Sequence, residues 1–190
     1  MTSEPTLPEL NVQSGASLSA GPFAQPPERD ATPAEMKALA HPLRWRILRE
    51  TLDAPLTNKQ LARRLGRDPG TVLHHVRVLV DGGFLAAQDV RAGNRGALER
   101  PYRSTGKSWQ IQLKHDPGSA GAILQAVQEE MAEGGEDGVL SLLRLGVRLS
   151  PEDVAALRKR LSDLGDEFAA RDDPSGERIA ILALVHRRRQ

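Results

Sequence analysis

The sequence predicts an α+β fold in two parts, and three observations lead to this prediction. Three helix-like segments follow one another between residues 34 and 82, separated by short turns. Two extended runs then flank the turn RAGNRGA at 91–97, a pattern typical of a β-hairpin. The last third of the chain places a long amphipathic helix pattern between two apolar runs, which predicts a second, small α/β domain.

Composition limits the classes of protein to consider. A chain of 190 residues can form one sizeable domain or two small ones. No run reaches the roughly 18–20 apolar residues that cross a membrane, and the N-terminal residues do not resemble a secretion signal. The absence of cysteine excludes disulfides, thiol catalysis and thiolate metal sites. We therefore expect a cytoplasmic, nucleoid-associated protein without membrane contact.

Charge is divided unevenly along the chain. Residues 34–115 contain 15 Lys and Arg against 7 Asp and Glu, whereas residues 116–183 contain 7 against 14. A basic half joined to an acidic half indicates that one half meets a polyanion. The alternative is a pair of domains that attract each other.

The domain limits follow from composition shifts. Residues 1–33 hold six of the thirteen prolines and no apolar periodicity, which predicts a disordered N-terminal arm. The Asp-Pro-Gly triplet at 116–118 marks the next boundary. We expect a domain over 34–115 and a second domain over 116–190.

Spacing and capping residues predict the helices of the first domain. Met36, Leu39, Leu43 and Ile47 recur at steps of three and four, and Pro42 either kinks this helix or starts a new one. The second helix opens at Thr57 with Gln60 in a capping box, and its Leu61 and Leu65 face inward. The third opens at Asp68 with Pro69 in its first position. Its buried stripe comprises Val72, Val76, Leu79 and Val80.

Extended patterns complete both domains. Residues 84–90 and 98–105 predict the two strands of the hairpin, and KSWQIQL at 107–113 predicts a third strand or a link. In the second domain we expect a helix over 119–133. A β-α-β unit should follow across 142–186, with its helix opened by Ser150 and Pro151. Such a small sheet buries little by itself, so we expect this half to dimerise, with room for a small-molecule effector.

Helix, turn, helix and β-hairpin form the layout of a winged helix-turn-helix, in which one helix enters the major groove of DNA. The outward positions of the third helix are Gly70, Thr71, His74 and Arg77, and Arg77 can donate two hydrogen bonds to guanine. Further residues suited to DNA contacts, mostly with phosphates, lie at the start of the second helix (Thr57, Asn58, Lys59) and in the hairpin (Arg91, Asn94, Arg95, Arg100, Arg103).

These segments together resemble the ArsR-type family of bacterial winged-helix regulators. LAHPLRWRIL at 39–48 is similar to the family's opening motif, and HHVRVLVDGGFL at 74–85 is similar to the end of its recognition helix. GNRGALERPYRST at 93–105 corresponds to its hairpin. Leu73 stands where the family often has Ser or Thr, and the cysteines with which many relatives bind metal are missing. The resemblance implies a homodimer on an inverted-repeat operator.

The sequence therefore predicts a sequence-specific regulator of transcription, a repressor, whose partner is double-stranded DNA. A module that binds proteins instead of DNA is the alternative function. We find no pattern of catalytic residues, so we expect no enzyme, and we expect no cofactor and no metal. His74 and His75 point about 100° apart on a helix and do not suit one metal ion. We expect His75 to be packed and hydrogen-bonded, with His74 facing outward.

Overall fold

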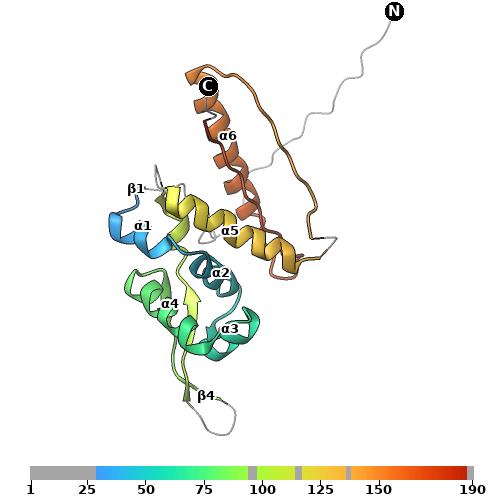
Figure 1. The fold of residues 1–190 in the computed structure, drawn as a ribbon. Coiled ribbons are helices and arrows are strands. Elements are labelled where there is room, and N and C mark those ends of the chain that lie inside the picture. The colour runs from blue at the N-terminus through green and yellow to red at the C-terminus, as the bar shows by residue number, and fades with distance from the viewer. Residues whose placement is uncertain (1–28, 94–97, 114–116, 136–137, 188–190) are drawn as a thin grey trace, which may run out of the picture.

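The computed structural model describes residues 29–93, 98–113, 117–135 and 138–187. Its helices are α1 (Pro33–Leu39), α2 (Pro42–Glu50), α3 (Asn58–Arg64), α4 (Pro69–Asp81), α5 (Pro117–Glu133) and α6 (Pro151–Ala169), with a short 3-10 helix, η2 (Lys107–Trp109). Its strands are β1 (Arg29–Asp30), β2 (Leu56–Thr57), β3 (Leu85–Ala87), β4 (Arg91–Ala92), β5 (Leu98–Glu99), β6 (Pro101–Ser104) and β7 (Ile111–Gln112). α5 lies on one side of α2, and α3 and α4 lie on the other (Figure 1).

One apolar core joins α1 to α4 and the strands that follow them. Leu39, Ile47, Leu61 and Leu79 come from four different helices and are fully buried. Val72 of α4, Phe84 and Leu85, the first residue of β3, belong to the same core. The inner faces of α3 and α4 are thereby fixed, which leaves their outer faces free for another role.

The predicted helix starts are confirmed. Pro42 begins a new helix, and the ring of His41 accepts a hydrogen bond from the backbone N–H of Leu43. Thr57 and Gln60 form the reciprocal capping box at α3. At α4 the Asp68 carboxylate accepts hydrogen bonds from the N–H groups of Gly70 and Thr71, at 2.8 and 3.0 Å.

The predicted hairpin is also confirmed, and residues 85–104 are called the wing below. β6 is the middle strand of a three-stranded antiparallel sheet in the order β2-β6-β3, with Ala86 opposite Arg103. Further out, β4 pairs with β5 and Arg91 stands opposite Glu99. The wing extends beyond α3 and α4 (Figure 1). Its tip, residues 94–97, lies outside the described residues, and so do the predicted DNA contacts Asn94 and Arg95.

Regular secondary structure begins earlier in the chain than the sequence predicts. Residues 29–33 were expected in a disordered arm, but β1 pairs in parallel with β7, with Arg29 opposite Ile111. Thr32 then caps α1 and forms a capping box with Glu35. The stretch 107–113 forms η2 and the short strand β7, so it is part helix and part strand. The expected disorder of residues 1–28 concerns residues that the structure does not describe.

Helix α5 packs against α1 and α2. Its buried residues are small, Ser119, Ala122 and Ala126, which allows a close approach of the helices. This helix begins just after the predicted boundary at residue 116, yet it lies on the same body as the helices before that boundary.

The predicted C-terminal α/β unit is only partly present. Helix α6 is confirmed, with the Ser150 hydroxyl accepting a hydrogen bond from the N–H of Asp153. The two flanking strands are wrong, because residues 138–150 and 170–187 form no strand. The residues of both runs are exposed, and neither run finds a strand partner in the described part of the chain. Within the described ranges, no helix combines the length and apolar character of a membrane span.

Candidate nucleic-acid interface

The outer face of α4 is exposed along its length. Gly70, Thr71, His74 and Arg77 are all solvent-exposed, as their helical spacing predicts. Among the described residues, none forms a hydrogen bond or ion pair with the side chains of Thr71, His74 or Arg77. This face therefore presents unoccupied donors and acceptors on a helix that is fixed from behind.

His75 fixes α4 to α2 on the opposite face. Its Nδ1 accepts a hydrogen bond from Arg44 Nε at 3.2 Å, and its ring lies 4.3 Å from the ring of His41. Burial, with the nearby His41 and Arg44, lowers the pKa of His75 to about 4. The ring is therefore neutral at pH 7 and able to accept this bond. The expectation of a packed His75 beside an outward His74 is confirmed.

The start of α3 contributes less exposed surface than the sequence predicts. Lys59 is exposed, but Thr57 is buried and its hydroxyl accepts the capping hydrogen bond from Gln60. Asn58 is half-buried, and its Nδ2 donates to the carbonyl of Pro69 at 2.9 Å. The Thr57 side chain thus lies away from the exposed surface, and Asn58 links the start of α3 to the start of α4.

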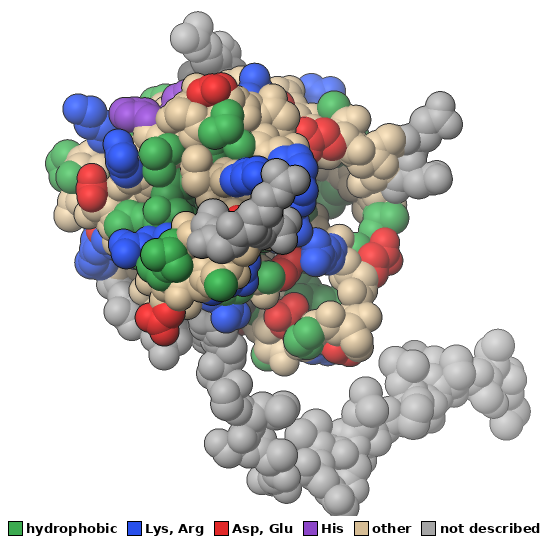
Figure 2. Space-filling model, turned by 90° about the horizontal axis from the view of Figure 1, so that it is seen from below, with side chains coloured by type: hydrophobic (Ala, Val, Ile, Leu, Met, Phe, Trp, Pro, Cys, Tyr) green, Lys and Arg blue, Asp and Glu red, His purple; other side chains and the backbone are tan. Residues whose placement is uncertain are grey.

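Cationic side chains surround α4. Lys59 on α3 and Arg91, Arg100 and Arg103 on the wing are exposed. Two further arginines that were not among the predicted DNA contacts, Arg63 on α3 and Arg67 in the turn before α4, are also exposed. Figure 2 looks from below onto the end of the molecule that carries α3, α4 and the wing, and Lys and Arg side chains are spread across it.

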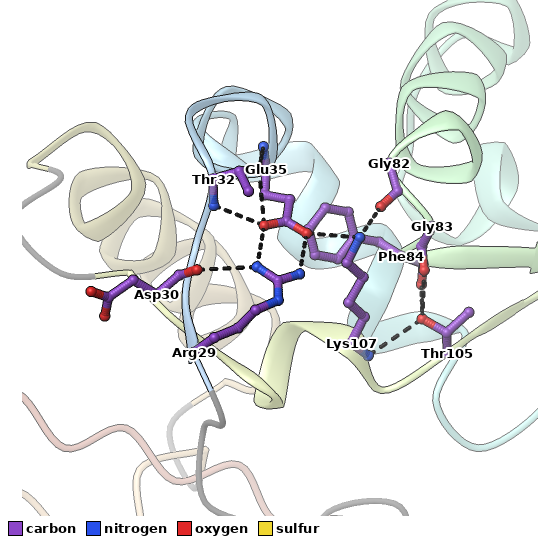
Figure 3. Close-up of polar contacts among 9 residues, drawn as sticks. All are labelled: Arg29, Asp30, Thr32, Glu35, Gly82, Gly83, Phe84, Thr105 and Lys107. Carbon is purple, nitrogen blue, oxygen red and sulfur yellow. Dashed lines mark hydrogen bonds and ion pairs between the residues drawn. The ribbon is translucent and has the colours of Figure 1, made fainter.

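A charged network holds the C-terminal end of α4 (Figure 3). Lys107 Nζ donates to the Gly82 carbonyl at 2.6 Å and lies 2.8 Å from the Glu35 carboxylate and 5.0 Å from the centre of the Phe84 ring. Glu35 is buried and accepts two further hydrogen bonds from Arg29. These bonds, first of all from Arg29, hold the pKa of Glu35 far below its usual range although burial opposes this. The network ties α1, η2 and β1 to the end of α4.

This charged network was not predicted from the sequence. The spacing of Thr32 and Glu35 is a capping-box pattern, which could have pointed to an ordered start at residue 32. Nothing in the sequence pairs Glu35 with Lys107, which lies far along the chain. Within the described ranges, no group of three or more His, Asp or Glu side chains is placed to hold a metal ion.

Comparison with known proteins agrees with the geometry of α3 and α4. The family profile of the helix-turn-helix domain matches residues 39–87, so this chain contains a helix-turn-helix domain. No curated protein matches the chain significantly. Two solved structures of ZitR from Lactococcus lactis, a single and a double mutant, are each 18% identical and cover 72% and 73% of this chain and 75% of theirs. Their TM-scores of 0.28 and 0.27 are too low to describe a shared overall fold.

Proposed function

We propose that this protein is a sequence-specific DNA-binding regulator of transcription. The observation that carries the proposal is the exposed polar face of α4, with Thr71, His74 and Arg77 on a helix fixed from behind by the core. A major groove admits one helix, and the residues near its N-terminal end contact the base edges. α4 offers small and hydrogen-bonding groups at that end.

Each residue of the interface receives a role from its chemistry. Arg77 donates a bidentate pair to guanine, Thr71 and His74 bond base edges or phosphates, and Gly70 permits close approach of the backbone. Phosphates are contacted by Lys59 and by the wing residues Arg91, Arg100 and Arg103, with Asn94 and Arg95 from the tip. Thr57 and Asn58 act through position, since both are engaged within the protein.

We further propose that the chain binds an inverted repeat as a homodimer and acts as a repressor of ArsR type. The resemblance of residues 39–48 and 74–85 to that family supports this, and so does the helix-turn-helix match. Double-stranded DNA and a second copy are the partners. A small-molecule effector that releases the DNA is compatible with the proposal. A reporter assay with and without the protein distinguishes repression from activation.

The role of the exposed face of α4 in contacting bases is tested with Arg77→Ala. Selection of bound genomic DNA supplies the preferred site. On this site the variant should bind about 1–3 kcal/mol more weakly and accept more bases at one position, with little change on unrelated DNA. Lys159→Ala on α6 is the matched control, because Lys159 is exposed and its partner among the described residues is Asp163 of its own helix. If Arg77→Ala left the preference for this site unchanged, the residues that contact the bases would lie elsewhere.

The alternative function is a module that binds proteins instead of DNA. If no genomic fragment gave a salt-sensitive mobility shift, this alternative would replace the regulator.

Phosphate contact is tested with Lys59→Ala. Removing one phosphate contact releases one counterion fewer, so binding should weaken on all sequences alike and the slope of log K against log salt should fall by about one unit. Fluorescence anisotropy across a salt series measures this slope. A loss confined to the preferred site would instead assign Lys59 to base reading.

A further inference from the structure

The C-terminal part of the chain exposes far more apolar surface than it covers. Two runs, residues 139–149 and 179–185, are called the C-terminal apolar segments here. They contain twelve large apolar side chains whose exposed fractions run from 43 to 88%. These are Val139, Leu140, Leu142, Leu143, Leu145, Val147, Leu149, Ile179, Ile181, Leu182, Leu184 and Val185. Apolar surface of this extent marks an association site.

The backbone of both segments lacks strand pairing, although the Ile179 carbonyl accepts a hydrogen bond from the Arg49 side chain of α2 at 3.3 Å. Neither segment forms a strand or a backbone–backbone hydrogen bond with another described residue. Helix α6 between them has no buried residue, and its Val154, Leu164 and Phe168 are exposed as well. A capped amphipathic helix between two exposed apolar runs has the sequence pattern of a β-α-β unit but lacks the neighbour that would complete its sheet.

We propose that a second copy of this chain covers the C-terminal apolar segments, with residues 179–185 of the two copies pairing strand to strand. A stable interface buries roughly 800 Å² per partner, and the apolar surface available for it here is that of the twelve side chains of the two segments, each 43 to 88% exposed.

The order of strands follows from the two patterns. In a two-fold dimer a strand that meets its own copy runs antiparallel to it. Residues 179–185 carry no charge and are apolar on both faces, which suits the centre of a sheet. Residues 144–149 alternate with arginine and suit the edges. The dimer then holds a four-stranded sheet with the two 179–185 segments at its centre.

This inference specifies where the homodimer of the proposed function is held, and its test needs no DNA. Sedimentation of the full chain should give a dimer at micromolar concentration. Ile181→Lys places a charge in the central pair and should weaken dimerisation by at least about 100-fold. The matched control is Leu124→Lys, an exposed apolar residue on α5, which should remain dimeric. A monomeric parent chain, or a dimer broken by Leu124→Lys but not by Ile181→Lys, would overturn the inference.

Disulfide cross-linking is a second test of this interface, and it does not require a charge that disrupts the dimer. The chain has no cysteine, so a single introduced cysteine reports one position. Ile181→Cys, Leu182→Cys and Ala183→Cys are oxidised in turn, because antiparallel pairing brings at least one of these to its own copy within disulfide reach. At least one should give covalent dimers, and Arg63→Cys on α3 should not. The inference is contradicted if covalent dimers form only through the α3 position, or if no position gives them.

The proposed function and this interface can fail separately. A dimer that gave no salt-sensitive DNA shift would overturn the proposed regulator but not the interface.

Discussion

Glu35 is a buried carboxylate that the fold keeps ionised. Its oxygens accept hydrogen bonds from Arg29, Lys107 and Thr32, and its side chain is only 9% exposed. Arg29 and Lys107 are themselves partly exposed, which reduces the energy of each pair.

Glu35→Gln should therefore lower the free energy of unfolding by about 1–3 kcal/mol, because neutralising the carboxylate weakens its charge-assisted hydrogen bonds from three residues at once. Urea unfolding followed by circular dichroism measures the change. Glu50→Gln is the control, since Glu50 pairs with Arg64 at the surface and should cost under about 1 kcal/mol. Equal losses in the two variants would mean that burial adds nothing to the Glu35 network.

His75 makes stability depend on pH. Its folded-state pKa is about 4, below the ordinary value of 6.5, because burial disfavours the charged ring. A group with a depressed pKa stabilises the fold above its unfolded pKa, and this contribution is lost as pH falls through the folded pKa. Between pH 6.5 and 4 the chain should lose about 3 kcal/mol through His75. His75→Gln should flatten this part of the stability curve, whereas His74→Gln, at the exposed neighbour, should retain it.

Single residues could be predicted wherever one helix period decides their position. The spacing along 69–81 correctly separated buried Val72 and Val76 from exposed Thr71 and Arg77. It could not show that Asn58 is held by Pro69 or that Thr57 is buried, because those environments come from the packing of α3 against α4 and the sheet.

At the scale of elements, one buried cation links α5 to α2 in addition to the packing of the small buried residues of α5. Arg46 is 5% exposed at its side chain and donates to Glu129 and Glu133 of α5. Arg67, in the turn before α4, lies 3.8 Å from the same Glu129. Burial alone would lower the pKa of Arg46, but the two carboxylates raise it, so the guanidinium stays charged.

Removing the carboxylates should cost more than removing the cation. The double variant Glu129→Gln, Glu133→Gln leaves Arg46 charged, buried and unpaired, and should destabilise the fold by about 2–4 kcal/mol. Arg46→Met replaces the guanidinium with an apolar side chain of similar length and should cost about 1 kcal/mol or less. Thermal unfolding of both variants gives the comparison. The reverse order would show that the ion pairs themselves, and not the avoidance of a buried lone charge, stabilise α5.

Elements were predictable where the signal is local. Caps such as Asp68 with Pro69 and Ser150 with Pro151 gave the starts of α4 and α6 correctly, since the side chain and the helix it caps are adjacent in sequence. The strands expected within 144–150 and 177–185 failed, because a strand also needs a partner at hydrogen-bonding distance. The sequence pattern describes only the side chains of the strand itself.

At the scale of the whole molecule, the uneven charge has a structural counterpart. The exposed cations Lys59, Arg77 and Arg103 lie on α3, α4 and the wing, whereas acidic residues are concentrated in the half that contains α5 and α6. An acidic half repels DNA, so it favours binding through one end of the molecule. The exposed apolar surface of that half then remains available to a second copy.

The DNA-binding end and the C-terminal apolar segments together predict how the spacing between two half-sites on DNA controls binding affinity. If a C-terminal sheet joins two chains, the two α4 helices reach successive major grooves only when the half-sites are separated by whole helical turns, in steps of about 10 bp. Inserting about 5 bp between half-sites turns one of them to the opposite side of the duplex and should reduce binding of the parent chain strongly, while inserting about 10 bp should restore part of it. Ile181→Lys should bind each half-site independently and show no such periodicity. Mobility shifts on a series of spacer lengths measure this. A periodicity that persisted in Ile181→Lys would place the link between the two chains outside the C-terminal apolar segments.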